Sequence, residues 1–344
     1  MPVTGFRAKS PRIEGLSVAF DLSLSNHDKE EPRSPILHAC PPLLVMSVFS
    51  IIPAIGVGTG LFSMDIAALG PIFLAISVIV ACGLRLSCLK MPMIGHFVWA
   101  SGTFYLIALI VPLACAVLAR TALPYADEAL SQADQMLGFD WMAMIHLYQA
   151  HPIASEFLAR VYMTLNWQPQ LLLLLLCIFR STPMVYRFLT AWALCLLMTV
   201  ALFPFFPAVA AFDFYRINVA DMPGPIMEYD WKLREIMDGL RNGTDAVLGL
   251  DHLKGIITMP SFHAASAVLL TWGYWSLTWM RWPFLLLNVI MIISALPIGG
   301  HYLIDIFAGM ALAALSIQGA NHIHRRIDNF EGVRLIARSS LQAA

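Results

Sequence analysis

Two short polar patterns stand out in the apolar C-terminal half of the chain: Pro260-Ser261-Phe262-His263 and Gly300-His301-Tyr302-Leu303-Ile304-Asp305. His301 and Asp305 are four residues apart, so on a helix they share one face, and the carboxylate can accept a hydrogen bond from one imidazole nitrogen. The other nitrogen is then free to act as a nucleophile or a base. His263 supplies a second imidazole, and two imidazoles in different surroundings can divide nucleophilic attack and proton donation between them.

Small residues beside the two histidines suit an anionic ligand. Ser261 follows Pro260 at a predicted helix start, where a hydroxyl and free backbone N–H groups can bind an anion such as phosphate. Gly299 and Gly300 would let the backbone approach a ligand closely. Each feature alone has an ordinary explanation, as an interfacial histidine, a helix start or a turn. Their occurrence together favours a catalytic site that handles phosphate.

The composition indicates the kind of protein that carries these residues. Of the 344 residues, 59% are hydrophobic and 12% are charged, with a mean hydropathy of +0.72. A soluble domain has about 25% charged residues, so an all-α, polytopic membrane protein is predicted. The formal net charge of −1 gives no general case for a nucleic-acid partner. The six cysteines lack paired spacing, and neither a disulfide framework nor a metal site is expected.

Eight apolar segments are long enough to be read as membrane spans. The predicted spans are Pro42–Phe62, Ala68–Leu89, His96–Leu118, Glu156–Phe179, Tyr186–Phe206, Phe262–Met280, Trp282–Ile298 and Tyr302–Gln318. The sixth and seventh form a hairpin that crosses the membrane and returns. This hairpin would bring His263 and His301 to the same membrane face, where polar groups at the ends of apolar helices are costly and usually functional.

The distribution of Lys and Arg predicts the orientation of these spans. With both termini inside, the inner segments carry most of the basic residues, and His263 and His301 face outward. We therefore expect an inner membrane of a bacterium, with the site facing the periplasm. Arg120 and the basic residues of the outer loop 207–260 are exceptions. The inner basic residues are Arg7, Lys9, Arg12, Lys29, Arg33, Arg85, Lys90, Arg180, Arg187, Arg281, Arg325, Arg326, Arg334 and Arg338.

Three outer segments surround the predicted site. The loop Thr121–Ser155 is mildly acidic with apolar residues at helical spacing, and is interpreted as surface helices over the outer face. The loop Pro207–Pro260 is rich in cations, which either serve an anionic substrate or belong to a solvated loop. The stretch Tyr162–Gln170 either lines a headgroup pocket or caps the fourth span. The loop cations are Arg216, Lys232, Arg234, Arg241 and Lys254.

At the two polar patterns the chain resembles the type 2 phosphatidic acid phosphatase superfamily, in its second and third signature motifs. The likeness is greatest to the branch of inositol phosphorylceramide synthases (the aureobasidin-resistance, inositolphosphotransferase type of sphingolipid metabolism) and their bacterial relatives. The resemblance implies a six-helix core. It divides the chain into a cytoplasmic polar tail (1–41), two additional transmembrane helices (42–95), a catalytic membrane domain (96–320) and a basic cytoplasmic tail (321–344).

The resemblance also implies roles for individual residues. His301 would take the phosphoryl group as a phosphohistidine, Asp305 would orient it, and His263 would protonate the leaving alcohol and then activate water or an acceptor hydroxyl. Ser261 would bind a phosphate oxygen. No metal or other cofactor is required in this family. The implied partners are the bilayer and a lipid phosphate or phosphodiester substrate, with no prediction of oligomeric state.

Two departures from the family pattern concern positive charge. The third motif of the family has an arginine six residues before the histidine, where this chain has Ala295. The first motif, Lys-x6-Arg-Pro, is absent, and the pair of basic residues most similar to it is Arg234 and Arg241. A transferring phosphoryl group needs charge stabilisation, so cations of the outer loop are expected to supply it. Arg241 is the first candidate, followed by Arg234 and Lys254.

Other classes of function are compatible with parts of this pattern. A lipid phosphate phosphatase would use the same residues with water as the acceptor. A transporter would be expected to show inverted repeats and broken helices in corresponding halves, and no such symmetry is visible. A non-catalytic scaffold would tolerate loss of His263, His301 or Asp305, yet all three are present. A haloperoxidase is disfavoured by the lipid-embedded setting and the small number of cations.

Overall fold

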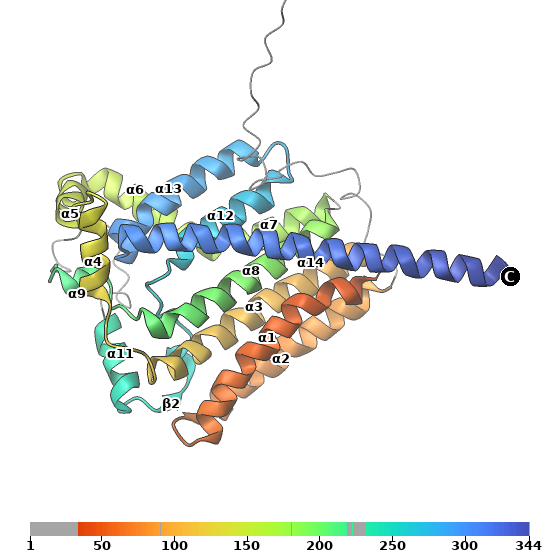
Figure 1. Cartoon of the computed structure of the whole chain (residues 1–344), viewed down its shortest axis with the longest axis horizontal. Helices are drawn as coiled ribbons and strands as arrows, with labels where there is room; N and C mark the ends of the chain where they lie inside the picture. The colour runs from red at the N-terminus through yellow and green to blue at the C-terminus, as the bar shows by residue number, and fades with distance from the viewer. Residues whose placement is uncertain (1–33, 90, 180, 219–221, 223–231, 344) are drawn as a thin grey trace, which may run out of the picture.

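The computed structural model describes residues 34–343, except 90, 180, 219–221 and 223–231. The described chain is an all-α helix bundle, as predicted (Figure 1). Its α-helices are α1 (Pro35–Gly58), α2 (Ile66–Ser87), α3 (Pro92–Ala119), α4 (Asp127–Met136), α5 (Trp141–Ala150), α6 (Pro152–Tyr162), α7 (Gln168–Ile178), α8 (Thr182–Leu202), α9 (Ala211–Phe214), α11 (Leu233–Asn242), α12 (Phe262–Trp275), α13 (Arg281–Gly299) and α14 (Leu303–Ala343).

Membrane-spanning character is confirmed, but the predicted count of eight spans is not. Within the described residues, six helices are long and apolar enough to cross a membrane: α1, α2, α3, α8, α13 and α14. The predicted fourth span is broken at a 3₁₀ turn, η2 (Met163–Asn166), between α6 and α7, which meet at an angle of 52° and would make a seventh span if they cross together. The predicted sixth span, α12, has only 14 residues. At 1.5 Å per residue it is about 21 Å long, short of a hydrocarbon core of about 30 Å.

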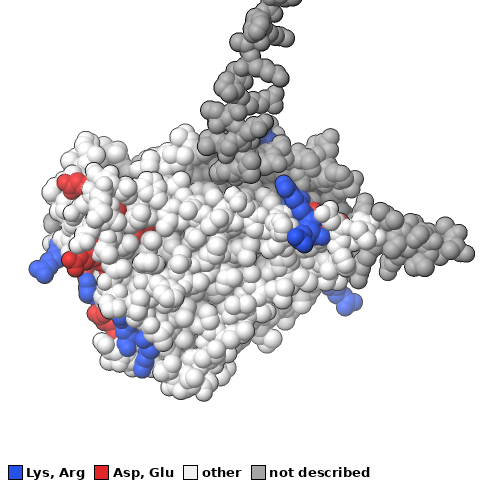
Figure 2. Space-filling view, in the orientation of Figure 1, with Lys and Arg blue, Asp and Glu red and all other residues white. Residues whose placement is uncertain are grey.

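The distribution of charge on the surface fits a membrane-embedded bundle. In the face shown in Figure 2, Lys, Arg, Asp and Glu gather toward the two ends of the bundle, and a broad uncharged surface lies between them. Large apolar side chains such as Leu44, Ile66 and Leu74 are more than half exposed on α1 and α2. Exposure of this kind is stable where the surrounding solvent is lipid. The first two helices pack beside α3, with α1 also contacting α8.

A layer of short elements covers one end of the bundle, which we call the outer end. It comprises α4, α5, α9 and α11 (Figure 1). The helices predicted within Thr121–Ser155 are thus confirmed as α4 and α5. Two residues of the first outer loop, β1 (Ser63–Met64), pair in parallel with β2 (Val247–Leu248) of the long loop. This two-residue ladder joins the α1–α2 connection to the outer layer. Two further 3₁₀ turns are η3 (Phe203–Phe205) and η5 (Leu250–His252).

The helix ends differ from the predicted boundaries of the two tails. Most of the N-terminal tail, residues 1–33, lies outside the described residues, and α1 begins at Pro35, inside the range predicted to be tail. At the other end α14 has 41 residues and continues without interruption through the predicted boundary at residues 320 and 321. The predicted C-terminal tail is therefore a helical extension of the last span.

Candidate active site

The two motif histidines come together because the starts of α12 and α14 are joined at the outer end. Ser261 caps α12, with its Oγ accepting a hydrogen bond from the N–H of Ala264 at 3.3 Å. The backbone N–H of Ser261 donates to the carbonyl oxygen of Asp305 at 3.0 Å. Gly309 permits this contact, because a Cβ there would lie 2.1 Å from the carbonyl oxygen of Ser261. The rings of His263 and His301 are thereby held with their centroids 6.4 Å apart.

Asp305 lies next to the imidazole of His301. Its Oδ2 is 3.5 Å from Nδ1 of His301 and accepts the backbone N–H of Tyr302 at 3.0 Å. The carboxylate is fully buried. A separation of 3.5 Å is longer than a good hydrogen bond, but contacts of this kind often tighten when substrate binds. The arrangement places a carboxylate on the Nδ1 side of His301, as the i, i+4 spacing predicts.

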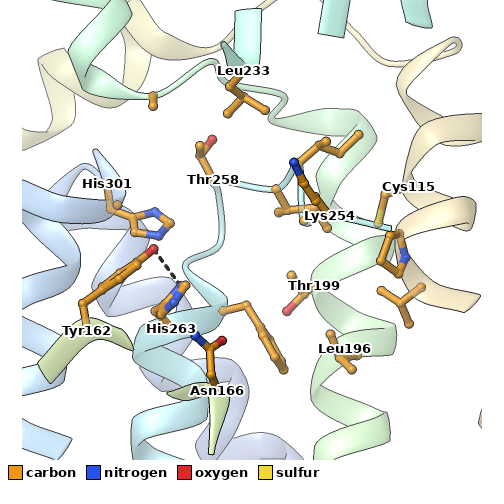
Figure 3. A pocket seen from close by; sticks show the side chains of 18 residues that line it. Cys115, Tyr162, Asn166, Leu196, Thr199, Leu233, Lys254, Thr258, His263 and His301 are labelled. Carbon is orange, nitrogen blue, oxygen red and sulfur yellow. Dashed lines mark hydrogen bonds between the residues drawn. The ribbon is translucent and has the colours of Figure 1, made fainter. Parts of the chain in front are cut away.

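Tyr162 packs directly on His263 and was singled out in the sequence only as part of a polar stretch. The two rings are stacked, with centroids 3.9 Å apart and an angle of 16° between their planes. The Tyr162 hydroxyl is 3.1 Å from Nδ1 of His263, and this hydrogen bond is drawn in Figure 3. Because Nδ1 is occupied by the phenol, Nε2 of His263 is the nitrogen available for proton transfer. Tyr162 is the last residue of α6, at the break between α6 and α7.

Gly299 and Gly300, which precede His301, lie so close to neighbouring side chains that a Cβ at either position would collide with them. A Cβ at Gly299 would lie 2.9 Å from both Cδ2 of His301 and the Tyr162 hydroxyl oxygen. Gly300 has φ of +61°, a conformation that glycine adopts without strain, and a Cβ there would lie 2.5 Å from the ring of Phe212. The groups that lie closest to this backbone are His301, Tyr162 and Phe212, so the approach of a ligand to the two glycines stays a prediction.

Both histidines line a cavity of about 660 Å³. Figure 3 shows His263, His301, Tyr162 and Asn166 on one side and Cys115, Leu196 and Thr199 on the other, with Lys254 between them. The walls from α3 and α8 are mostly apolar, while the polar groups gather around the histidines and the segment from Lys254 to Thr258. The cavity therefore has an apolar part and a small polar part that contains both imidazoles.

The predicted phosphate-binding residues are not all at this cavity. Lys254 lines it. Arg241 instead donates to the carbonyl oxygens of Ala122 at 3.2 Å and Leu123 at 3.0 Å, and lies over the ring of Tyr125. Arg234 forms an ion pair with Asp213 and also lies over Tyr125.

Ser261 does not line the cavity either. Its side chain is fully buried, and its Oγ caps α12. The structure thus places Lys254 in the lining of the same cavity as the two histidines, while the two arginines connect α11 to the segment 122–125 and to α9. No group of three or more His, Cys, Asp or Glu side chains is arranged to hold a metal ion among the described residues.

The backbone around His301 is held by residues that the motifs do not contain. The indole N–H of Trp141 donates to the carbonyl oxygen of His301 at 3.2 Å, and the N–H of Ala211 donates to that of Gly300 at 2.8 Å. Asp134 accepts the N–H groups of Leu303 and Ile304 at 2.8 and 2.9 Å. These contacts come from α5, α9 and α4, so the outer layer fixes the segment that carries His301.

Asp127, on α4, completes this set of contacts. It accepts the Tyr302 hydroxyl at 3.1 Å and the N–H of Val209 at 3.1 and 3.2 Å with its two oxygens. Burial raises the pKa of Asp127 and of Asp134, although the hydrogen bonds that each accepts oppose the rise. Burial, with Asp127 nearby, also raises the pKa of Tyr302 far above its usual range, so this hydroxyl stays protonated as a donor. The sequence signal for the two carboxylates is their spacing of seven on a helix, which placed them on one face without showing that the face is buried.

Comparison with known proteins agrees with the motifs. The chain matches the PAP2 superfamily over residues 128–318, a region that runs from α4 to α14 and contains both histidines and Asp305. No curated protein and no solved structure matches the chain. The matched region covers more than half of the 344 residues. The chain belongs to the PAP2 superfamily.

Proposed function

We propose that this protein is an integral-membrane lipid phosphoesterase and phosphotransferase that works through a phosphohistidine and transfers a phospho-headgroup to a lipid acceptor. Membership of the PAP2 superfamily supports phosphoesterase-type chemistry on lipids. The observation that carries the proposal is the pair His263 and His301 lining one cavity, with the Asp305 carboxylate 3.5 Å from Nδ1 of His301.

The proposed reaction has two steps. In the first, His301 attacks the phosphorus, an N–P bond forms, the P–O bond to the leaving alcohol breaks, and His263 gives that oxygen a proton. In the second, the hydroxyl of an acceptor attacks the same phosphorus, His263 takes its proton, and the N–P bond breaks. Asp305 stabilises the positive charge that develops on His301. Lys254 stabilises the negative charge on the phosphoryl oxygens.

The charge of the cavity supports a phosphodiester substrate over a phosphomonoester. Among the described residues that line it, Lys254 is the one Lys or Arg side chain. A phosphomonoester carries about −1.5 to −2 charge at neutral pH, whereas a phosphodiester carries about −1, because its single ionisable proton is lost well below pH 7. One cation therefore suits the singly charged ligand better. This is the argument for headgroup transfer of the inositol phosphorylceramide synthase type.

The apolar part of the cavity and the shortness of α12 support a lipid as the bound molecule. Trp275, Trp279 and Trp282 flank the α12–α13 turn, and tryptophan is enriched at membrane interfaces. If that turn lies at the inner interface, α12 carries His263 about 21 Å toward the outer face, which leaves the site inside the hydrocarbon core near its outer boundary. The positive-inside pattern then supports a site that faces the periplasm of a bacterial inner membrane.

The test is turnover by purified protein in detergent. Wild type, His301→Ala and His263→Ala are incubated with labelled lipid phosphates and phosphodiesters, with and without ceramide or diacylglycerol, in the presence of a chelator. The matched control is His146→Ala, an exposed histidine on α5. The expected result is a new labelled lipid that depends on the added acceptor and is lost in His301→Ala but not in His146→Ala.

Two other results have defined meanings. Release of inorganic phosphate without an acceptor, lost in His301→Ala, would make the protein a phosphatase and refute headgroup transfer. Activity of His301→Ala equal to wild type on any lipid would refute the phosphohistidine mechanism.

A further inference from the structure

Helix α4 has an unusual distribution of polar residues. A helix in an outer layer normally turns an apolar face toward the protein and a polar face toward water. The buried residues of α4 are Asp127, Leu130, Ser131 and Asp134, whereas Met136 is 86% exposed. Asp127 and Asp134 are only 4% and 1% exposed. Burying two carboxylates costs free energy unless each accepts hydrogen bonds, so we consider the partners of each carboxylate.

The partners of Asp134 belong to the segment that carries the catalytic residues. The first N–H groups of a helix have no partner within the helix, and a short polar side chain at the N-cap usually supplies one. At the start of α14 the preceding residue is Tyr302, a buried aromatic that cannot cap in this way. The carboxylate of Asp134 takes this place from 169 residues away, with one oxygen on the N–H of Leu303 and the other on that of Ile304.

These two N–H groups lie between His301 and Asp305 in the chain. A displacement of Leu303 or Ile304 therefore changes the position of the imidazole relative to the carboxylate that orients it. The Asp127 contact to the Tyr302 hydroxyl holds the same segment from the side, two helical turns away along α4. The third polar residue of the buried face, Ser131, is 2.8 Å from the hydroxyl of Tyr215 and makes no contact of this kind with the segment.

We propose that Asp134 is a positioning residue for the phosphoryl-transfer reaction: by capping α14 from α4, its carboxylate fixes His301 and Asp305 relative to each other and to His263. This inference rests on the proposed function for the meaning of its kinetic effect. It assigns α4, which the sequence places over the outer face, a part in the active site. Asp134 touches no reacting atom, and its effect passes through the backbone of α14.

The alternative is that Asp134 stabilises α14 and does nothing for the geometry of the site. Asp65 provides the matched control, because it also caps a helix at the outer end, accepting the N–H of Ala68 at 3.0 Å at the start of α2, and does not line the cavity. The variants are therefore Asp134→Ala, Asp134→Asn and Asp65→Ala. Asparagine offers one acceptor oxygen, while its NH₂ group faces the second N–H, so it should restore only part of the cap.

The experiment combines kinetics with a readout that needs no turnover. For Asp134→Ala we expect kcat to fall about 10- to 100-fold with KM within about twofold, an intermediate fall for Asp134→Asn, and no fall for Asp65→Ala. Histidine-selective labelling, with the His301 ring signal assigned by its loss in His301→Ala, should show that signal displaced or broadened in both Asp134 variants and unchanged in Asp65→Ala.

Each outcome has a defined meaning. An unchanged His301 signal together with unchanged kcat in a folded Asp134→Asn protein would overturn the positioning role, whatever the substrate. So would a KM increase with kcat intact. If Asp134→Ala does not fold, Asp134→Asn and the ring signal carry the test. Full activity of His301→Ala would overturn the proposed function instead, while the displacement of the His301 signal would still decide whether Asp134 positions this residue.

Discussion

Replacement of Gly299 by alanine tests the site geometry most directly. The new Cβ would lie 2.9 Å from Cδ2 of His301 and 2.9 Å from the Tyr162 hydroxyl oxygen. Carbon atoms in favourable contact are about 3.5–4.0 Å apart, so the rings must move by about 0.6 Å or more. A displacement of about 1 Å in a catalytic group can reduce the rate about 10²-fold. We therefore expect kcat/KM to fall about 10- to 100-fold, equivalent to about 1.4–2.7 kcal/mol of transition-state stabilisation.

The assay compares Gly299→Ala with Gly58→Ala in the same detergent, on the lipid substrate that the panel identifies. A Cβ at Gly58 has no heavy atom within 4 Å, so this control should keep full activity. The obstructing atoms at Gly299 are side-chain tips, and the bundle is expected to fold in both variants, as size-exclusion chromatography and thermal unfolding would show. A folded Gly299→Ala protein with wild-type kcat/KM would refute the reasoning, because it would mean that the positions of His301 and Tyr162 do not limit the reaction.

Two further predictions concern charged residues. Lys254→Gln should lower kcat/KM about 10-fold or more, because a charged contact to the phosphate is lost. Arg241→Gln should lower the Tm and leave kcat/KM within about threefold. The opposite result would mean that Arg241, and not Lys254, binds the phosphate. Burial raises the pKa of Asp127, so between the unfolded value of about 3.9 and this raised pKa the folded protein binds the proton more tightly than the unfolded chain. Stability due to this group is therefore lost as pH rises through that window, and the Tm of Asp127→Asn minus that of wild type should increase from pH ~4 to pH ~8. A difference that stays constant or decreases would contradict the burial of a charged Asp127.

The motif residues could be located from the sequence because their geometry is local. The i, i+4 spacing of His301 and Asp305 fixes their common side on any helix, and the structure places the carboxylate on the Nδ1 side of the imidazole. The apolar α12–α13 hairpin returns the chain to the face from which it left, which is why His263 and His301 meet. Where a feature depends on helical period and on membrane thickness alone, elementary geometry is sufficient.

The number of spans and the positions of the loop cations depend on contacts between distant segments, which the sequence does not display. Apolar composition alone does not reveal that the fourth span bends at η2 or that α12 ends at Trp275. Arg234 and Arg241 were chosen for their spacing, but spacing does not identify a partner. In the structure Arg234 pairs with Asp213, and Arg241 donates to the carbonyl oxygens of Ala122 and Leu123. Of the described Lys and Arg residues, Lys254 lines the cavity.

The acidic residues of α4 show a limit of pattern-based interpretation that has a physical cause. Helical spacing assigns Asp127 and Asp134 to one face, and their charge assigns that face to water. The face is buried, and the hydrogen bonds that these two carboxylates accept come from backbone N–H groups and a phenol hydroxyl. A backbone N–H group does not depend on the residue type, so no sequence pattern shows which N–H groups need a carboxylate as acceptor. The local signal is the helix start itself. Where the residue before the first turn is a large aromatic, as Tyr302 is before Leu303, the capping group must come from elsewhere in the chain or from solvent, and burial of that helix start removes the solvent.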